Sequence, residues 1–135
     1  MTVVVDASVV VAALVDSGED GSWAEAVLAA EDLAAPHLMP VEAANVLRRS
    51  VAADRLSADA AALAHADLLA LPVALFPYAP FGTRVWELHA NLTAYDAWYV
   101  ALAEAIDAPL ATLDTQTSRA PGLRCRIRTP SSDGE

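Results

Sequence analysis

Residues 93–114 read "TAYDAWYVALAEAIDAPLATLD", and they carry the strongest indication of how the chain folds. Its first part, residues 93–106, has apolar residues at helical spacing, many good helix formers and no internal Gly or Pro, which predicts a helix. Its last part, residues 109–114, is a short apolar run that ends in an acid, which predicts a buried strand. A helix that leads directly into a buried strand is typical of the βαβ units that build parallel sheets.

The rest of the chain continues this alternation. Strands are predicted at residues 2–6, 33–38, 72–78 and 124–128, and helices at residues 7–15, 23–31, 40–54, 57–71 and 81–91. We therefore expect an α/β fold with three α/β/α layers and a mainly parallel central sheet flanked by helices. Residues 1–128 form one domain in this interpretation, and residues 129–135 form a polar, flexible C-terminal tail.

Composition and charge exclude several classes of protein and of site. The chain has 135 residues, which suits a single domain with one core, and 56% of them are hydrophobic, which argues against disorder. The net charge of −10 argues against a nonspecific nucleic-acid coat protein, although an enzyme whose acids hold cations is compatible with it. The one cysteine, Cys125, excludes an intramolecular disulfide and a multi-cysteine zinc site.

The apolar segments are those of a core rather than of a membrane anchor. None reaches the roughly 18 residues that a membrane span needs. The first residues, "MTVVVDAS", lack the positive region of a signal peptide, because Asp6 interrupts the apolar run at once. We expect a cytoplasmic protein that does not associate with membranes.

Two acids come at the ends of predicted strands. Asp6 ends the first strand, and Asp114 ends the strand of residues 109–114. In open α/β sheets, ligands bind outside the carboxyl ends of the strands. A carboxylate directly after a buried strand needs hydrogen-bond partners or a cation.

Two further acids come at predicted helix starts, where a carboxylate is favourable. Pro40 at the first helical position makes Glu42 the third residue of its helix, and Thr93 as N-cap makes Asp96 the third residue of its own. Taken singly, Asp96 is more often an ordinary helix cap and Glu42 a solvated first-turn acid. Together with the strand-end acids, they indicate a site for a hard cation, Mg²⁺ or Mn²⁺.

Polar neighbours lie at short spacings from these acids: Ser8, Asn45, Arg49 and Thr112. Asn45 and Arg49 follow Glu42 by three and seven residues and so share its helix face. Ser8 follows Asp6 by two residues, and Thr112 precedes Asp114 by two, which on a strand puts Thr112 on the same side as Asp114. Local backbone hydrogen bonds are the ordinary alternative for these hydroxyls. Further along the chain, four arginines form either a solvated face or a set of phosphate contacts: Arg119, Arg124, Arg126 and Arg128.

Three stretches together carry a family resemblance: "VVVDASVVVAAL" (residues 3–14), "PVEAANVLRR" (residues 40–49) and "LTAYDAWYVALAEAIDAPLATLD" (residues 92–114). The sequence resembles PIN-domain ribonucleases and, more closely, the VapC toxins of bacterial toxin–antitoxin pairs. The resemblance runs from Thr2 to about Arg128. It implies the PIN-like version of the three-layer fold.

The resemblance also implies an activity, a site and partners. The activity is Mg²⁺- or Mn²⁺-dependent hydrolysis of phosphodiester bonds in single-stranded regions of RNA. The expected partners are a second copy of the chain, in a homodimer, and a VapB-like antitoxin whose C-terminal segment blocks the site. Carried over by motif, the catalytic and metal-binding residues are Asp6, Glu42, Asp96 and Asp114, the supporting polar residues Ser8, Asn45 and Thr112, and the RNA-binding residues Arg49 and Arg119.

One segment departs from the family pattern. Relatives often carry another acid shortly after the last carboxylate, but residues 115–125 read "TQTSRAPGLRC", so Thr115 or Thr117 would have to substitute. This departure concerns the geometry of a second metal ion and not the four acids.

The alternative function is a catalytically degenerate PIN-fold module that binds RNA or protein, although the presence of all four acids argues against it. A receiver domain would need a lysine, which the chain lacks, and a haloacid-dehalogenase-type phosphatase would need D-x-D where Asp6 begins D-x-S.

Overall fold

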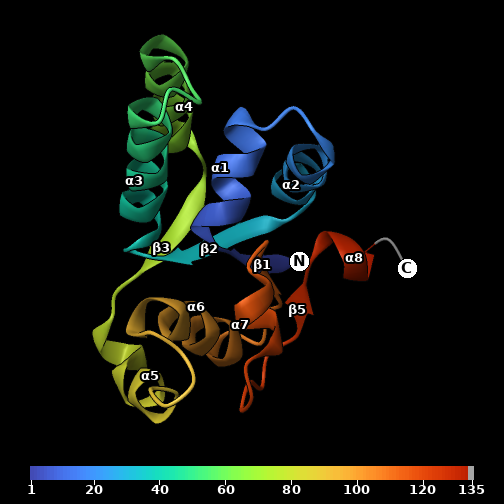
Figure 1. The fold of residues 1–135 in the computed structure, drawn as a ribbon. Coiled ribbons are helices and arrows are strands. Elements are labelled where there is room, and N and C mark those ends of the chain that lie inside the picture. The colour runs from blue at the N-terminus through green and yellow to red at the C-terminus, as the bar shows by residue number, and fades with distance from the viewer. Residues whose placement is uncertain (134–135) are drawn as a thin grey trace.

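In the computed structural model, which describes residues 1–133, five parallel strands form one sheet in the order β3-β2-β1-β4-β5 (Figure 1). The central strand β1 (Thr2–Val5) pairs with β2 (Asp32–Pro36) on one side and with β4 (Leu110–Ala111) on the other. The outer strands are β3 (Val73–Phe76) and β5 (Ile127–Arg128). The parallel sheet predicted from the alternation of strands and helices is confirmed.

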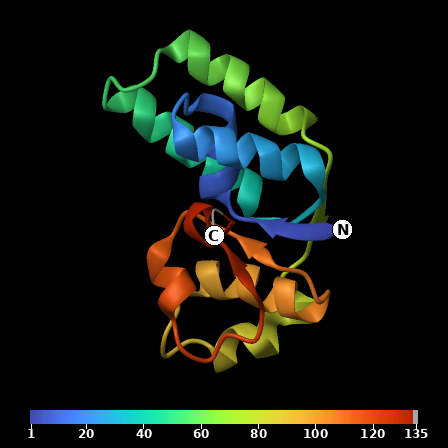
Figure 2. The same ribbon diagram turned by 90° about the vertical axis from the view of Figure 1, so that its right-hand side faces the viewer.

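Helices cover both faces of the sheet, as Figures 1 and 2 show, so the expected three layers are present. One layer contains α1 (Ala7–Val15), α2 (Glu19–Ala30), α3 (Met39–Ala52) and α4 (Ala58–Ala70). The opposite layer contains α5 (Gly82–Glu87), after a 3₁₀ turn at Ala79–Phe81, and α6 (Ala94–Ala105). Two short helices follow, α7 (Thr115–Arg119) and α8 (Pro130–Asp133). Within residues 1–133, no helix has the length and apolar character needed to cross a membrane.

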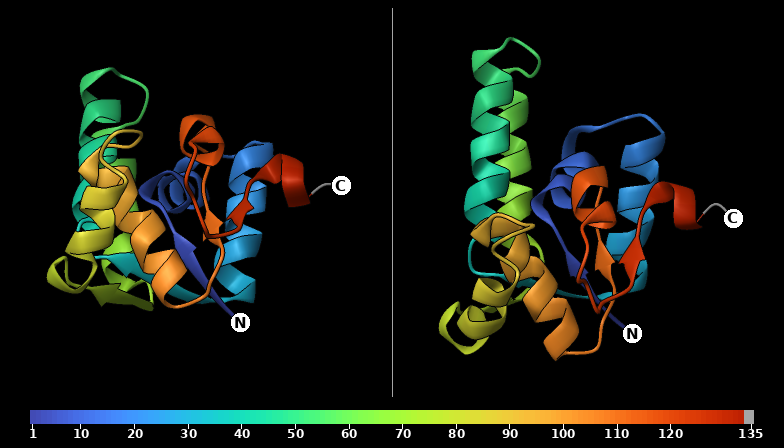
Figure 3. Two further views of the ribbon diagram at one scale, coloured as in Figure 1. Left: turned by 90° about the horizontal axis from the view of Figure 1, so that it is seen from below. Right: turned by 60° about the horizontal axis from the view of Figure 1, so that its bottom comes forward.

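Helices α3 and α4 form an antiparallel pair that extends beyond the sheet, as both panels of Figure 3 show. Helix α1 packs against α3, α4 and α2, and so joins this pair to the rest of its layer. Because α3 follows β2 and α6 precedes β4, both helices begin at the edge where the strands end. This topology brings two helix N-termini and the carboxyl ends of β1 and β4 to the same place.

The core is centred on β1, whose residues Val3, Val4 and Val5 have no exposed surface. Completely buried residues of α1 and α6, such as Val10 and Val100, belong to the same core. Burying a side chain of this size stabilises the fold by about 1.5–3 kcal/mol relative to leaving it in water. The end of β1 is therefore firmly anchored, and with it the residue that follows, Asp6.

Several element boundaries differ from the prediction. Helix α2 begins at Glu19, four residues before the predicted start, because Glu19 and Asp20 occupy its first turn, where acids are favourable. Gly21 fits there because a Cβ atom would lie 1.8 Å from the Asp16 carbonyl oxygen. The strand predicted at residues 72–78 is shorter and is a half-exposed edge strand, and the helix predicted at residues 81–91 ends at Glu87.

The described part of the C-terminal segment makes defined contacts. In α8, the Asp133 carboxylate accepts a hydrogen bond of 2.8 Å from the Trp23 indole N–H and pairs with Arg128 at 2.8 Å. Arg128 lowers the pKa of Asp133, with burial acting in the opposite direction. Residues 134 and 135 of the predicted flexible tail lie outside the described residues, and the domain boundary at residue 128 stays a prediction.

Candidate active site

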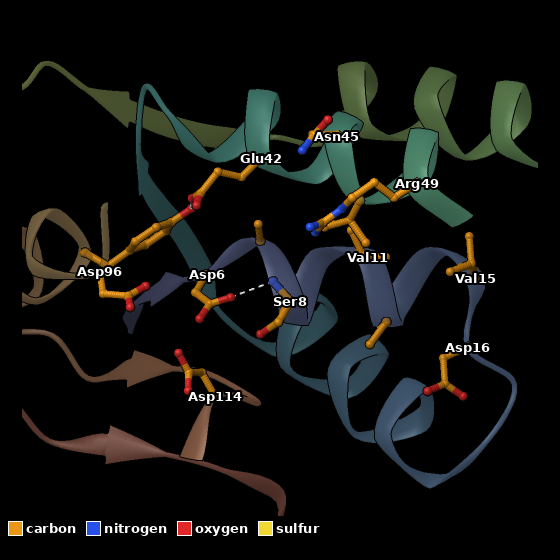
Figure 4. A pocket seen from close by; sticks show the side chains of 14 residues that line it. Asp6, Ser8, Val11, Val15, Asp16, Glu42, Asn45, Arg49, Asp96 and Asp114 are labelled. Atoms are coloured by element: carbon orange, nitrogen blue, oxygen red, sulfur yellow. Dashed lines mark hydrogen bonds between the residues drawn. The ribbon is translucent and has the colours of Figure 1, made fainter. Parts of the chain in front are cut away.

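One pocket at the carboxyl edge of the sheet contains side chains from four different elements (Figure 4). Its volume is about 600 Å³, and its lining includes all four acids singled out in the sequence: Asp6, Glu42, Asp96 and Asp114. Each of these side chains is half-buried. The apolar part of the wall comes from α1, including Val11 and Val15.

Asp6 is held at both carboxylate oxygens. It is the N-cap of α1, where it accepts a hydrogen bond from the Ser8 backbone N–H, and its other oxygen accepts one of 2.6 Å from the Thr112 hydroxyl. The completely buried Thr112 hydroxyl in turn accepts a bond of 2.9 Å from the Asp114 N–H. The Ser8 hydroxyl accepts a bond of 3.2 Å from the Leu113 N–H. These bonds tie the end of β1 to the end of β4.

Asp114 is an N-cap as well as a strand-end acid. It begins α7, which the sequence interpretation missed, and accepts hydrogen bonds of 2.9 Å and 3.3 Å from the N–H groups of Gln116 and Thr117. The buried Thr117 hydroxyl donates a third bond of 2.9 Å to this carboxylate. Thr117 therefore orients Asp114, whereas the exposed Thr115 lines a different pocket. An N-capping aspartate before a short polar run that ends at Pro121 is the signal that could have revealed α7.

Glu42 lies one position later in its helix than the sequence predicted. Helix α3 begins at Met39 rather than Pro40, so Glu42 is the fourth residue, and its N–H donates within the helix to the Leu38 carbonyl at 3.0 Å. Its carboxylate accepts a hydrogen bond of 2.6 Å from the Tyr99 hydroxyl of α6. The sequence analysis did not single out Tyr99 and missed this contact. The available signal was its position three residues after Asp96, which puts both on one helix face.

Asp96 occupies the third position of α6, as predicted, and its N–H donates to the Thr93 hydroxyl at 3.2 Å. Burial is the main cause that raises its pKa, followed by the charges of Asp114 and Asp6. The pKa of Glu42 is also raised by burial, while the Tyr99 hydrogen bond lowers it and the charges of Asp6 and Asp96 raise it further. The carboxylates are thus close enough to repel one another.

The predicted supporting and RNA-binding residues fall in two places. Asn45 and Arg49 line the pocket with the acids, and Figure 4 shows Arg49 reaching from α3 toward α1. The Asn45 side-chain oxygen accepts a bond of 3.0 Å from the Arg48 guanidinium. Arg119 lies elsewhere, in a small pocket with Ser118 and parts of the C-terminal segment. The structure therefore unites Arg49 with the acids and separates Arg119 from them.

The chemistry of the pocket suits a divalent cation. Carboxylate oxygens are the preferred ligands of Mg²⁺ and Mn²⁺, and a positive ion would stabilise the charged forms of Glu42 and Asp96, whose pKa values are raised by burial and, after it, by repulsion between the acids. Among residues 1–133, however, no three Asp, Glu, His or Cys side chains are already placed to hold one ion. Three of the four carboxylates, those of Asp6, Glu42 and Asp114, accept hydrogen bonds from protein donors.

Comparisons with known proteins find relatives along most of the chain. The family model of the PIN domain matches residues 3–123. Ribonuclease VapC9 of Mycobacterium tuberculosis (strain H37Rv) is 42% identical over 125 residues, which cover 93% of this chain and 95% of the relative.

Two solved structures share the fold. Mycobacterium tuberculosis VapC20, described as a sarcin-ricin loop cleaving toxin, has a TM-score of 0.68 at 19% identity over 90% of this chain and 95% of its own. VapBC2 from Rickettsia felis, bound to a DNA fragment from their promoter, gives 0.66 at 14% identity over 96% and 98%.

Proposed function

Because this chain belongs to the PIN-domain family, and within it to the VapC ribonucleases, we propose that it is a metal-dependent endoribonuclease toxin that hydrolyses phosphodiester bonds in single-stranded regions of RNA. The observation that carries the catalytic part is the meeting of four carboxylates from β1, α3, α6 and the end of β4 in one pocket. The relatives that match along 93% of the chain are named ribonucleases, which supports the reaction class.

In this proposal, Asp6, Glu42, Asp96 and Asp114 hold Mg²⁺ or Mn²⁺. A bound divalent ion would supply an activated water and would neutralise charge at the phosphate. The protein contributes orientation: Asp6 and Asp114 are each fixed by backbone and hydroxyl donors, so their free lone pairs face a constant direction. Hydrogen bonds of this kind are what position ligand groups in metal sites.

Arg49 would bind the RNA backbone beside the reacting phosphate, since it lines the same pocket as the acids. Its guanidinium can form paired hydrogen bonds with phosphate oxygens. Arg119, in its separate pocket, would contact the strand further from the bond that is cut. Ser8, Asn45 and Thr112 serve as supporting polar groups.

We also propose the cellular setting. The partner would be a VapB-like antitoxin that occupies the acidic pocket, as the VapBC pairing of the Rickettsia felis structure suggests for a protein of this fold. The toxin would form a homodimer and act in the cytoplasm, where its RNA substrates are.

The test is expression of the chain without an antitoxin, followed by sequencing of RNA ends. Wild type should generate new, discrete RNA ends, and Asp114→Asn at equal expression should not. The purified wild type should cut the same RNA with Mg²⁺ or Mn²⁺ and lose this activity in EDTA. If RNA is bound but the ends are identical for both proteins, the nuclease proposal is refuted and the degenerate binding module is the better description.

A further inference from the structure

We propose that Tyr99 is a positioning residue that orients Glu42, so that one oxygen of this carboxylate is held by the phenol and only the other is free for the metal. This inference rests on the proposed function, because it assumes that Glu42 is a metal ligand. It adds to the pocket a functional side chain that binds neither metal nor RNA. The contact that carries it is the hydrogen bond of 2.6 Å from the Tyr99 hydroxyl to Glu42 Oε1.

Glu42 needs such a partner more than the strand-end acids do. Asp6 and Asp114 are short side chains that cap their own helices, and neighbouring backbone N–H groups fix them. Glu42 is longer, and ordering it costs more side-chain entropy. Its helix position offers no local cap. Within residues 1–133, the bond from Tyr99 is the one hydrogen bond that its carboxylate accepts.

Tyr99 is well placed to fix this orientation. It is 3% exposed, so the surrounding core prevents its ring from turning away. The distance of 2.6 Å lies within the range of strong hydrogen bonds from a hydroxyl to an ionised carboxylate.

The geometry sets how Glu42 can bind an ion. With Oε1 occupied by the phenol, the other oxygen, Oε2, would be the one left to hold an ion. Asp96 lies three residues before Tyr99 on the same face of α6. One helix therefore supplies a carboxylate of the site and also orients a second carboxylate, which belongs to α3.

The experiment measures Mn²⁺ binding to the RNA-free protein, with free Mn²⁺ followed by electron paramagnetic resonance. Tyr99→Phe keeps the ring and removes only the hydroxyl, and it should raise the Mn²⁺ dissociation constant about 10–100-fold, the usual cost of losing a group that orients a ligand. Tyr95→Phe is the matched control, since this tyrosine lies on the same helix and is 60% exposed. It should bind Mn²⁺ like wild type.

A double-mutant cycle separates positioning from a general structural role. Glu42→Gln alone should weaken Mn²⁺ binding, and adding Tyr99→Phe to it should cause no further loss. If Tyr99→Phe binds Mn²⁺ like the control, or weakens binding equally in the Glu42→Gln background, the inference is refuted. If Glu42→Gln itself binds normally, it is the proposed ligand set that fails.

Thermal melts in EDTA show which variants are folded at the assay temperature. Should Tyr99→Phe be unfolded there, Glu42→Asp provides the second test. It keeps the charge and the tyrosine but withdraws the carboxylate by one methylene, beyond reach of the phenol. Weakened Mn²⁺ binding is expected, and wild-type affinity in Glu42→Asp would overturn the inference.

Discussion

The substitution Thr112→Val tests the link between the two strand-end acids. Valine has nearly the shape of threonine, but it removes the hydroxyl that donates to Asp6 at 2.6 Å and accepts from the Asp114 N–H at 2.9 Å. Thr112 is completely buried, so water cannot take the place of its hydroxyl from that side. We therefore expect a stability loss without a change in packing volume.

The size of the expected stability loss follows from the two hydrogen bonds that Thr112→Val removes. A hydrogen bond to a charged group contributes about 1.5–3 kcal/mol, and leaving a buried N–H unpaired costs about 1–3 kcal/mol. Because Asp6 lines an open pocket and can regain water there, the low ends apply, and the loss should be about 2–3 kcal/mol. With an unfolding entropy of about 2.1 cal/mol/K per residue over 135 residues, this loss corresponds to a fall in Tm of about 7–11 °C.

The assay is a set of thermal melts in EDTA at neutral pH, followed by far-UV circular dichroism. Thr115→Val is the matched control, since this threonine is exposed and lies outside the acidic pocket, and it should melt like wild type. Thr112→Ser keeps the hydroxyl and should lose only the part that a buried methyl contributes, about 1 kcal/mol. A melt of Thr112→Val within about 2 °C of the control, or equal melts of the Val and Ser variants, would refute the hydrogen-bond reasoning.

The remaining predictions concern catalysis, RNA binding and charge. Asp6→Asn, Asp96→Asn and Asp114→Asn should each abolish metal-dependent RNA cleavage and keep a cooperative melt; near-wild-type cleavage by one variant would remove that residue from the catalytic set. Arg49→Ala and Arg119→Ala should each weaken RNA binding and make the slope of log affinity against log salt shallower by about 0.7, and unchanged slopes would assign both to the solvated surface. Because the folded pKa of Asp96 is raised, the folded state binds more protons than the unfolded chain, so metal-free wild type should lose stability as the pH rises from about 4 through that folded pKa. Asp96→Asn should lose less stability over this pH range, melt higher than wild type in EDTA at neutral pH, and gain less stability from added Mn²⁺. Identical profiles of stability against pH in the two proteins would contradict the repulsion between the carboxylates.

Local patterns predicted the parts of the site that are built locally. The Thr93 hydroxyl accepts a hydrogen bond from the Asp96 N–H, three positions along the chain. The spacing of these two residues was therefore enough to predict the helix cap and the third helical position. Asp6 and Asp114 were recognised because an acid directly after a buried apolar run has few structural explanations. The shift of Glu42 by one position shows the limit of such patterns, since Pro40 is compatible with either of the first two positions of a helix.

The sequence contains no comparable local pattern for contacts between distant residues. The Tyr99–Glu42 bond joins residues 57 positions apart, and the Thr112–Asp6 bond joins residues 106 positions apart. In the sequence, Tyr99 is one aromatic residue among the apolar positions of a helix. Arg49 and Arg119 were equivalent candidates for RNA contacts, and the structure places only Arg49 beside the acids.

The alternation of strands and helices, the parallel sheet and the edge where the acids gather can be predicted from the chain alone. They follow from hydrophobic periodicity, helix caps and the direction of each connection, which act over a few residues. The folded structure is needed to show which donor holds which carboxylate oxygen and which arginine shares the pocket. Those contacts depend on the packing of α3 and α6 against opposite faces of the sheet. Packing between distant elements produces no recognisable pattern in the spacing of residues along the chain.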